Sequence, residues 1–263
     1  MESSNINPLN KVEKYKIFEY FDFSIIEPNN GKYDYCMVFF AGFNENASKY
    51  IYLFKLFFEN FEPFQKIKII IPMLNRVTKD DYKNAVIPRD RKKDLNNLYS
   101  WFIVFKDELS DSGYKITSNP QKDLLVKKLV SDEVKKLGSS EKIIFAGFSM
   151  GGRYLLKILT EMKIKTMFNI ILKTVVFLYD NPYLNGESEE DRKFNDNNLH
   201  CYYSRYDKIV QFDNISKSFQ ILKRVFPKTT IRIDNNKKHI VDFNCLEYLR
   251  ILLMQYLIKN GKF

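Results

Sequence analysis

The sequence predicts an α/β fold in which helices cover both faces of a mostly parallel central sheet. Short apolar runs that lack polar alternation, such as residues 36–40, are typical of strands buried on both faces. Longer stretches in which apolar residues recur every three or four positions lie between these runs, as in helices that pack one stripe against a sheet. Strand and helix in alternation indicate a layered α/β sheet.

The elements are predicted in order along the chain. Apolar or alternating patterns predict strands at 15–23, 35–40, 67–71, 142–146, 174–179, 199–203 and 230–233. Apolar stripes at helical spacing predict helices at 48–61, 122–138, 154–162, 215–226 and 246–256. In the first of these helices Tyr50, Phe54 and Phe57 fall on one face, and each stripe is expected to pack on the sheet while lysines and acids face outward.

The length suits one domain that spans residues 1–263, with the first 14 residues or so loosely ordered. A hydrophobic fraction of 45% supplies ample material for a core. The segments 72–98 and 180–198 are polar, aperiodic and interrupted by proline. We expect them to form long loops over the carboxyl edge of the sheet, where such folds place their sites.

The chain is basic, with a formal net charge of +10 and a pI near 9.2. The charge is dispersed, and only residues 89–93 form a short cluster. Solvated helix and loop faces explain this pattern better than an anionic partner does. We expect no nucleic-acid partner because no basic-aromatic motif is present, while a weak peripheral membrane contact stays open.

The three cysteines, Cys36, Cys201 and Cys245, are too far apart in the sequence for a disulfide framework or a metal-site pattern. We therefore expect free thiols, no bound metal and a cytoplasmic protein. Residues 1–5 lack the features of a signal sequence. No apolar stretch approaches the ~20 residues that span a bilayer.

The sharpest chemical signal is the G-x-S-x-G segment at 147–151, which is followed by Gly152. It directly follows an apolar strand and directly precedes an amphipathic helix, the setting of a nucleophile elbow. An elbow needs glycines because side chains would collide at so sharp a turn. An ordinary glycine-rich turn is the alternative, but the setting favours Ser149 as a nucleophile.

A serine nucleophile needs a base, and the chain has only two histidines, His200 and His239. His239 follows the predicted strand 230–233 in a polar loop, whereas His200 lies inside a predicted strand, where a packing role is simpler. The order of serine, acid and histidine in this kind of site leaves room for Asp207 just after the strand 199–203. Asp213 is a nearby competitor for the acid, and a helix cap or turn is the alternative role for Asp207.

The oxyanion that forms on the substrate carbonyl when Ser149 attacks needs backbone N–H donors. One should be the N–H of Met150, the residue after the serine. The other should come from the loop after strand 35–40, where Gly42 allows a turn and the N–H of Phe43 is our candidate.

With these residues in place, the chain resembles the acyl-protein thioesterase, lysophospholipase and carboxylesterase branch of the α/β-hydrolases. The resemblance extends from about Tyr35 to His239. The segments that carry it are 144–152 (IFAGFSMGG), 70–72 (IIP), 100–102 (SWF), 206–210 (YDKIV) and 238–239 (KH). The resemblance implies that Trp101 lines an acyl pocket, and a core tryptophan is the equal alternative.

The chain also departs from that branch. The segment 41–45 (AGFNE) stands where the family has H-G-L-G-D, and Met150 replaces a glutamine. Residues 203–204 (YS) replace H-G, and Ile103 replaces an aspartate. No triad candidate is lost by these changes, although they put the substrate range in doubt.

The resemblance implies a cofactor-free hydrolase of acyl esters or thioesters that acts through an acyl-enzyme. Its first expected substrates are lipidated proteins, with lysophospholipids or small esters as the alternative. An inactive relative that acts as a binding protein is the alternative of another class. The sequence leaves the oligomeric state open.

Overall fold

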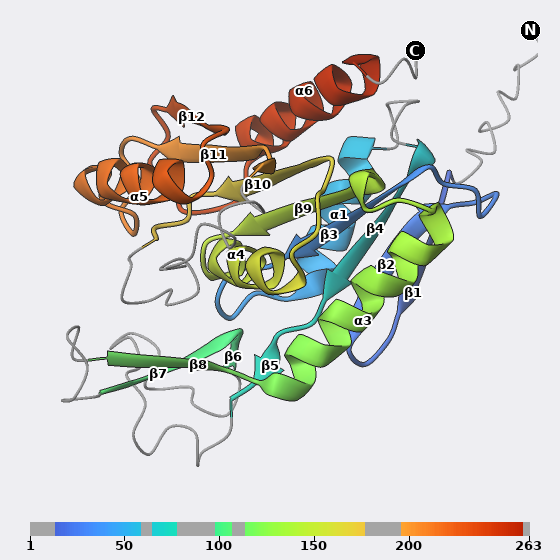
Figure 1. Ribbon diagram of the computed structural model, residues 1–263, viewed down its shortest axis with the longest axis horizontal. Helices are drawn as coiled ribbons and strands as arrows, with labels where there is room; N and C mark the ends of the chain where they lie inside the picture. The colour runs from blue at the N-terminus through green and yellow to red at the C-terminus, as the bar shows by residue number, and fades with distance from the viewer. Residues whose placement is uncertain (1–13, 59–64, 78–97, 107–113, 177–195, 260–263) are drawn as a thin grey trace, which may run out of the picture.

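An eight-stranded sheet in the order β1-β2-β4-β3-β9-β10-β11-β12 forms the centre of the computed structural model (Figure 1). The structure describes residues 14–58, 65–77, 98–106, 114–176 and 196–259. Strands from β4 to β12 in this order run parallel to one another, whereas β2 runs antiparallel to both of its neighbours, β1 and β4. The predicted α/β class with a mostly parallel sheet is confirmed. That residues 1–263 form a single domain stays a prediction.

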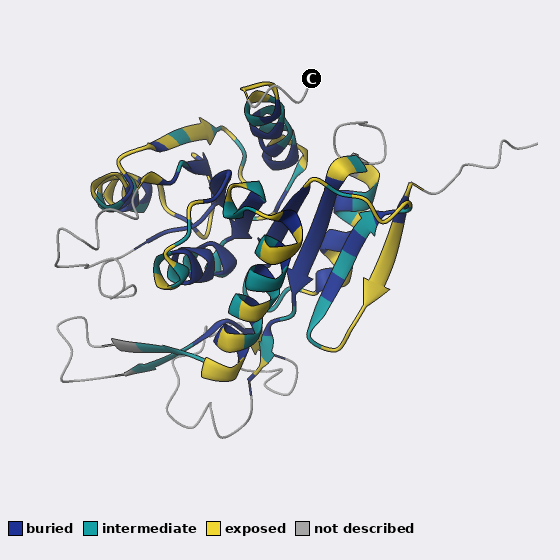
Figure 2. Cartoon of the chain, turned by 45° about the vertical axis from the view of Figure 1, so that its right-hand side comes forward, coloured by how far each residue is buried: buried dark blue, intermediate teal, exposed yellow. Residues whose placement is uncertain are grey.

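The strands of the main sheet differ in burial according to their place in it. They are β1 Tyr15–Glu19, β2 Phe23–Pro28, β3 Tyr35–Phe40, β4 Ile67–Pro72, β9 Ile143–Phe148, β10 Phe168–Leu172, β11 Leu199–Ser204 and β12 Thr229–Asp234. Every residue of β3, β4, β9, β10 and β11 is buried. The outer strands β1 and β12 carry exposed residues (Figure 2), as expected for the edges of a sheet.

Helices pack on both faces of this sheet. They are α1 Ala47–Phe58, α3 Pro120–Leu137, α4 Met150–Met162, α5 Phe212–Val225 and α6 Phe243–Lys259. Successive residues of a strand point to opposite faces. Phe39 contacts Tyr50 and Phe54 of α1, whereas Phe40 contacts Tyr154 of α4. The helices α1 and α4 therefore cover opposite faces (Figure 1).

Two strand predictions were wrong. The segment 15–23 is not one strand, because the chain turns after Glu19 and returns antiparallel as β2. The strand predicted at 174–179 lies earlier, at Phe168–Leu172, and Lys173 ends it with a positive φ of 49°. Both neighbouring runs are apolar, and periodicity alone does not separate them. Residues 177–179 lie outside the described residues.

Small strands also occur that we did not predict, and one of them, β5, lies within the predicted loop 72–98. They are β5 Asn75–Arg76, paired with β6 Tyr99–Ser100, and β7 Phe102–Lys106, paired with β8 Tyr114–Ser118. The greater part of the predicted loops, 78–97 and 180–195, lies outside the described residues. Among the helices that the structure describes, none combines the length and the apolar character needed to cross a membrane.

His200 is a packing residue of β11. Its Nδ1 lies 2.7 Å from Thr230 Oγ1, and its Nε2 lies 3.1 Å from the Tyr256 hydroxyl. Burial lowers the pKa of His200 to about 4. The folded protein therefore keeps this imidazole neutral at neutral pH.

This burial predicts a specific dependence of stability on pH. The pKa of a histidine in the unfolded chain is about 6.5, so between this value and the folded pKa the unfolded state binds more protons. The stability that the folded state gains from keeping His200 neutral is present above about pH 6.5 and is lost as the pH falls toward 4. We expect wild type to lose roughly 2–3 kcal/mol of unfolding free energy through His200 between about pH 7 and pH 4.5. Urea denaturation of wild type and His200→Gln at both pH values measures it.

The His239→Ala variant is the matched control, because it keeps His200 and should retain the dependence. An identical loss of stability in wild type and in His200→Gln would contradict the assignment.

Candidate active site

Ser149 stands at a sharp turn between β9 and α4. Its backbone has φ 52° and ψ −120°, a conformation that is costly for a residue with a side chain. The chain can turn here because Gly147 and Gly151 lack side chains. A Cβ on Gly147 would lie 2.8 Å from Gly151 O, and a Cβ on Gly151 would lie 2.1 Å from Phe40 O. The strand-turn-helix context that the sequence predicts for the elbow is present.

The structure brings the side chains of Ser149, His239 and Asp207 into one hydrogen-bonded chain. Ser149 Oγ lies 2.9 Å from His239 Nε2, and His239 Nδ1 lies 2.8 Å from Asp207 Oδ2. An ionised carboxylate only accepts hydrogen bonds, so Nδ1 carries the proton and Nε2 is free to accept from the serine hydroxyl. This is the arrangement in which an imidazole can remove the serine proton.

The environment of Asp207 keeps its carboxylate ionised. Burial by itself raises the pKa of Asp207. The hydrogen bond to His239 and the backbone N–H groups of Ile209 and Val210, which donate to Oδ1 at 2.8 and 3.0 Å, lower it. The pKa of Asp207 therefore lies below its ordinary value. The competing Asp213 is exposed in the first turn of α5.

The loop after β3 lies against the elbow. A Cβ on Gly42 would lie 2.8 Å from a ring carbon of Phe148, the residue that precedes the serine. The N–H of Met150 is at the first position of α4, where helix amides have no partner within the helix. Among the described residues, no acceptor is recorded for the N–H of Phe43. Two candidate oxyanion donors thus belong to segments in direct contact.

Glu45 anchors this loop, a role that the sequence did not reveal. Its Oε2 accepts the N–H of Gly42 at 3.1 Å and also the hydroxyl of Tyr50. Its Oε1 accepts from Lys49 Nζ at 2.7 Å. The only sequence signal was the spacing of Glu45 and Lys49, four residues apart, which also suits an ordinary pair on a helix.

Trp101 lies in the core rather than on an open surface. Its side chain is 1% exposed and stacks on Tyr154, with ring centroids 4.4 Å apart. Its indole N–H donates to the carbonyl of Ala41 at 2.7 Å. These contacts fit the core-packing alternative for Trp101, and its indole N–H supports the loop beside Gly42. The acyl-pocket role stays a prediction.

The residues after β10 also contact the site, although we expected them in a strand. Thr174 Oγ1 donates to the carbonyl of Ser149 at 3.1 Å. Lys173 Nζ donates to the carbonyl of Lys238 at 2.8 Å. Nothing in the local pattern of the sequence pointed to these long-range contacts.

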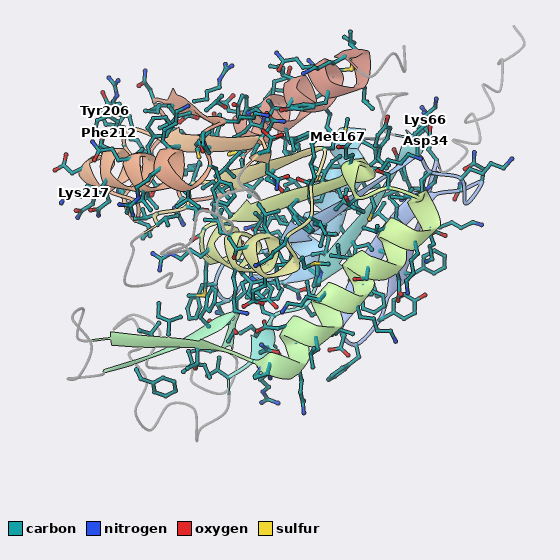
Figure 3. The ribbon with its side chains drawn as sticks, viewed as in Figure 1. Asp34, Lys66, Met167, Tyr206, Phe212 and Lys217 are labelled. Carbon is teal, nitrogen blue, oxygen red and sulfur yellow. The ribbon has the colours of Figure 1, made fainter. Side chains whose placement is uncertain are left out.

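Several apolar residues lie close in sequence to Asp207 and His239. The exposed members are Tyr206, Ile209, Phe212, Ile240 and Phe243, which we call the apolar rim. Tyr206 and Phe212 lie at one end of the molecule, and the Asp34–Lys66 pair lies at the other (Figure 3). An exposed apolar cluster beside a site is a common mark of ligand contact.

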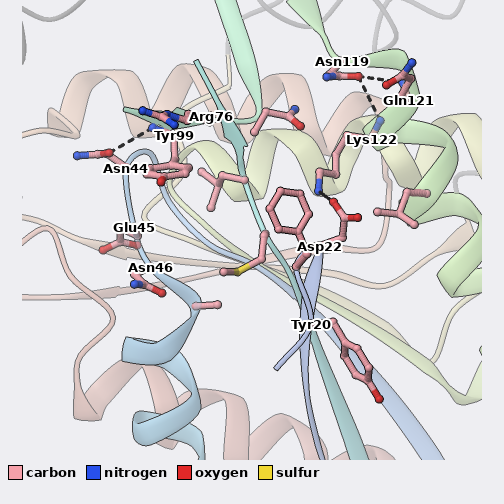
Figure 4. Close-up of a pocket in the computed structure, with 16 residues that line it drawn as sticks. Tyr20, Asp22, Asn44, Glu45, Asn46, Arg76, Tyr99, Asn119, Gln121 and Lys122 are labelled. Atoms are coloured by element: carbon pink, nitrogen blue, oxygen red, sulfur yellow. Dashed lines mark hydrogen bonds and ion pairs between the residues drawn. The ribbon is translucent and has the colours of Figure 1, made fainter. Parts of the chain in front are cut away.

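A cleft of about 950 Å³ opens beside the loop that carries Phe43 (Figure 4). The β1–β2 turn and the ends of α1, β4 and α3 contribute to its walls. Its lining mixes amides and charges, such as Asn44 and Arg76, with apolar residues such as Met73 and Leu125. The volume is in the range of sites for ligands larger than a simple ester.

The sheet order, the antiparallel pair at one end and the elbow after β9 together define the α/β-hydrolase fold. Solved structures share it. An acyl-protein thioesterase 2 from Zea mays has a TM-score of 0.64 and 16% identity, covering 90% of this chain and 100% of that one. A phospholipase/carboxylesterase from Dyadobacter fermentans has a TM-score of 0.57 and 14% identity, covering 89% and 96%.

A carboxylesterase from Bacillus cereus has a TM-score of 0.55 and 10% identity, covering 94% of this chain and 96% of that one. The resemblance to this branch of the α/β-hydrolases is thus confirmed at the level of the fold. No protein-family model and no curated protein sequence matches the chain. In the part of the chain that the structure describes, no group of three or more histidine, cysteine or acidic side chains is placed to hold a metal.

The elbow predicts a large effect of a single methyl group. In Gly151→Ala the new Cβ would meet backbone oxygens of Phe40 and Ala41 at 2.1 and 2.3 Å, and neither belongs to a flexible side chain. We expect the free energy of unfolding to fall by about 3 kcal/mol or more. Urea denaturation measures the change.

The control is Gly138→Ala, at the end of α3, where φ is 72° and no atom lies within 4 Å of the added Cβ. It should cost only the backbone term of about 1–2 kcal/mol. Equal losses in the two variants would show that close packing at the elbow has no special weight.

Proposed function

We propose that the chain is a serine hydrolase that cleaves carboxylic esters or thioesters through an acyl-enzyme. The observation that carries the proposal is the relay from Ser149 through His239 to Asp207. Three side chains from separate loops rarely adopt this order of contacts without catalytic use, because buried polar groups at a strained turn cost stability.

The first half of the reaction forms the acyl-enzyme. His239 Nε2 takes the proton of the Ser149 hydroxyl while Oγ attacks the acyl carbonyl carbon. The tetrahedral oxyanion accepts hydrogen bonds from the N–H groups of Met150 and Phe43. The imidazolium then gives its proton to the departing alcohol or thiol, and the carbonyl re-forms on Ser149.

The second half releases the acid. His239 takes a proton from water, the hydroxide attacks the acyl carbon, and the proton returns to Ser149 Oγ as the acid leaves. Asp207 stays ionised and stabilises the imidazolium in both halves. No step needs a metal or an organic cofactor.

Within this class we propose that the substrates are long-chain acyl groups on protein cysteines, as in an acyl-protein thioesterase. The exposed apolar rim, whose residues neighbour Asp207 and His239 in sequence, suits an alkyl chain. The cleft beside Asn44 is lined by none of the three triad residues, and its amides and charges suit a peptide portion of the substrate better than a small alcohol. A reducing, cytoplasmic setting belongs to the proposal, because the cysteines Cys36, Cys201 and Cys245 are free and buried.

A lysophospholipase or small-ester carboxylesterase is the alternative within the class, and an inactive binding protein is the alternative outside it. The altered segment 41–45 motivates the inactive reading. The intact hydrogen-bonded chain of Ser149, His239 and Asp207 argues against an inactive protein. The backbone donors of an oxyanion hole do not depend on the side chains that differ.

Replacing the serine should abolish turnover. We expect wild type to hydrolyse p-nitrophenyl esters and acyl-thioesters and to react with a fluorophosphonate probe. Ser149→Ala should lose roughly 10³-fold or more in kcat/KM and should not be labelled. His239→Ala should fall comparably, because it removes the base.

The His200→Gln variant is the control, since His200 hydrogen-bonds to Thr230 and Tyr256 and to no triad residue, and it should keep activity within about twofold. If wild type resists the probe under conditions that label known serine hydrolases, the inactive reading replaces the enzyme.

The apolar rim predicts a dependence on chain length. In the double variant Ile209→Ser and Phe243→Ser, kcat/KM for a palmitoyl-thioester peptide should fall roughly tenfold, because the two removed side chains together take away about 1.4 kcal/mol of apolar contact. Hydrolysis of p-nitrophenyl acetate should be unchanged.

Leu124→Ser, at an exposed site on α3, serves as the matched surface control. Parallel assays on a lysophospholipid decide between the two leaving groups. A preference for acetate in wild type would remove the long-chain proposal and leave the esterase.

A further inference from the structure

Lys173 is a fully buried lysine that directly follows β10. Its side chain is 0% exposed. Its ammonium group donates to the carbonyl of Lys238 at 2.8 Å and to Asp242 Oδ2 at 3.0 Å. A buried ammonium without partners would be strongly unfavourable, so these contacts are what keeps the charge in the interior.

Both partners belong to the loop that carries the histidine. Lys238 immediately precedes His239. Asp242 caps α6, where its Oδ1 accepts the N–H of Cys245 at 3.0 Å. Its Oδ2 also accepts from Asn236 Nδ2 at 2.6 Å. The ammonium therefore fixes the loop on both sides of the imidazole.

The backbone around Lys173 fixes the serine at the same time. The carbonyl of Leu172 accepts the N–H of Ser149 at 2.9 Å. Thr174 Oγ1 donates to the carbonyl of Ser149 at 3.1 Å. One short segment thus contacts the elbow through its backbone and hydroxyl and the histidine loop through its lysine.

The conformation of Lys173 is itself costly. Its φ is 49°, in the left-handed region that a glycine or asparagine occupies more easily. Its N–H donates to the carbonyl of Tyr202 at 2.6 Å, which holds it there. A lysine at a position that favours glycine indicates that contacts of its side chain offset the backbone strain.

We propose that Lys173 is a positioning residue that holds His239 in line with Ser149. It acts through the carbonyl of Lys238 and the carboxylate of Asp242 and touches no reacting atom. The inference rests on the proposed function for its kinetic consequence, but its structural consequence stands alone. An imidazole displaced by about 1 Å can cost 10²-fold in rate.

The kinetic test uses Lys173→Met, which keeps the length and removes the ammonium group. Its kcat on p-nitrophenyl butyrate should fall roughly 10- to 100-fold with KM within about twofold, because alignment and not binding is lost. The matched control is Lys68→Met, which breaks a second buried pair, Lys68 Nζ to Glu133 Oε1 at 2.7 Å, between β4 and α3. It should lower Tm and leave kcat within about twofold.

A double-variant cycle separates positioning from general loosening. In a His239→Ala background Lys173→Met should change the residual rate by less than about twofold, because the residue it positions is gone. The proposal fails if the full decrease persists in that background, or if Lys68→Met lowers kcat as much.

A spectroscopic readout does not depend on turnover. The chain has two histidines, so the imidazole signals of labelled protein are few. The low-field Nδ1 proton that His239 shares with Asp207 should be present in wild type and Lys68→Met and absent or broadened in Lys173→Met. An unchanged signal would overturn the inference, whereas a lost signal in a protein without esterase activity would overturn only the proposed function.

If Lys173→Met does not fold, Asp242→Asn takes its place in every arm. It keeps the shape of the acceptor and removes its charge. A smaller decrease in kcat, again absent in the His239→Ala background, supports the proposal. No decrease, with the low-field proton intact, contradicts it.

Discussion

The site depends on the hydrogen bond between Ser149 Oγ and His239 Nε2, which joins residues 90 positions apart. The local conformation of each residue does not by itself bring it to the other. The serine lies at a turn whose φ is 52°, and the histidine lies in a loop without regular structure. A bond of this kind forms only if the sheet fixes both loops to a fraction of an ångström. Much of the surrounding structure serves that requirement.

Parallel order in the sheet supplies the coarse placement. The carboxyl ends of β9, β10, β11 and β12 lie at one edge, and the serine, Lys173, the acid and the histidine each follow one of these strands. Finer placement comes from polar contacts between neighbouring loops. The Arg205 N–H donates to the carbonyl of Asp234 at 2.8 Å, and the Tyr206 N–H donates to the carbonyl of Asn236 at 3.3 Å. These bonds tie the acid loop to the histidine loop. Lys173 ties the histidine loop to the segment after β10.

The sequence predicts what depends on local pattern. The strands β3 and β4 are apolar at almost every position because both faces are covered, so their periodicity identified them. The elbow was equally recognisable, since the glycines that its sharp turn requires lie close to the serine in sequence, at 147, 151 and 152. The strand β10 was displaced in our prediction because the run from 167 to 179 is almost uniformly apolar. A lysine inside such a run suggests a surface position, whereas Lys173 finds its partners 65 and 69 residues away.

The segment 41–45 shows how an altered motif can keep its geometry. The H-G-L-G-D residues that the family resemblance leads us to expect are absent, yet backbone groups of Ala41, Gly42 and Asn44 all have hydrogen-bond partners. Glu45 accepts the Gly42 N–H, and Trp101 donates to the carbonyl of Ala41. The Asn44 N–H donates to the carbonyl of Tyr99 at 2.8 Å. Since oxyanion stabilisation needs a fixed backbone N–H and no particular side chain, a loop anchored by different residues can supply the same donor.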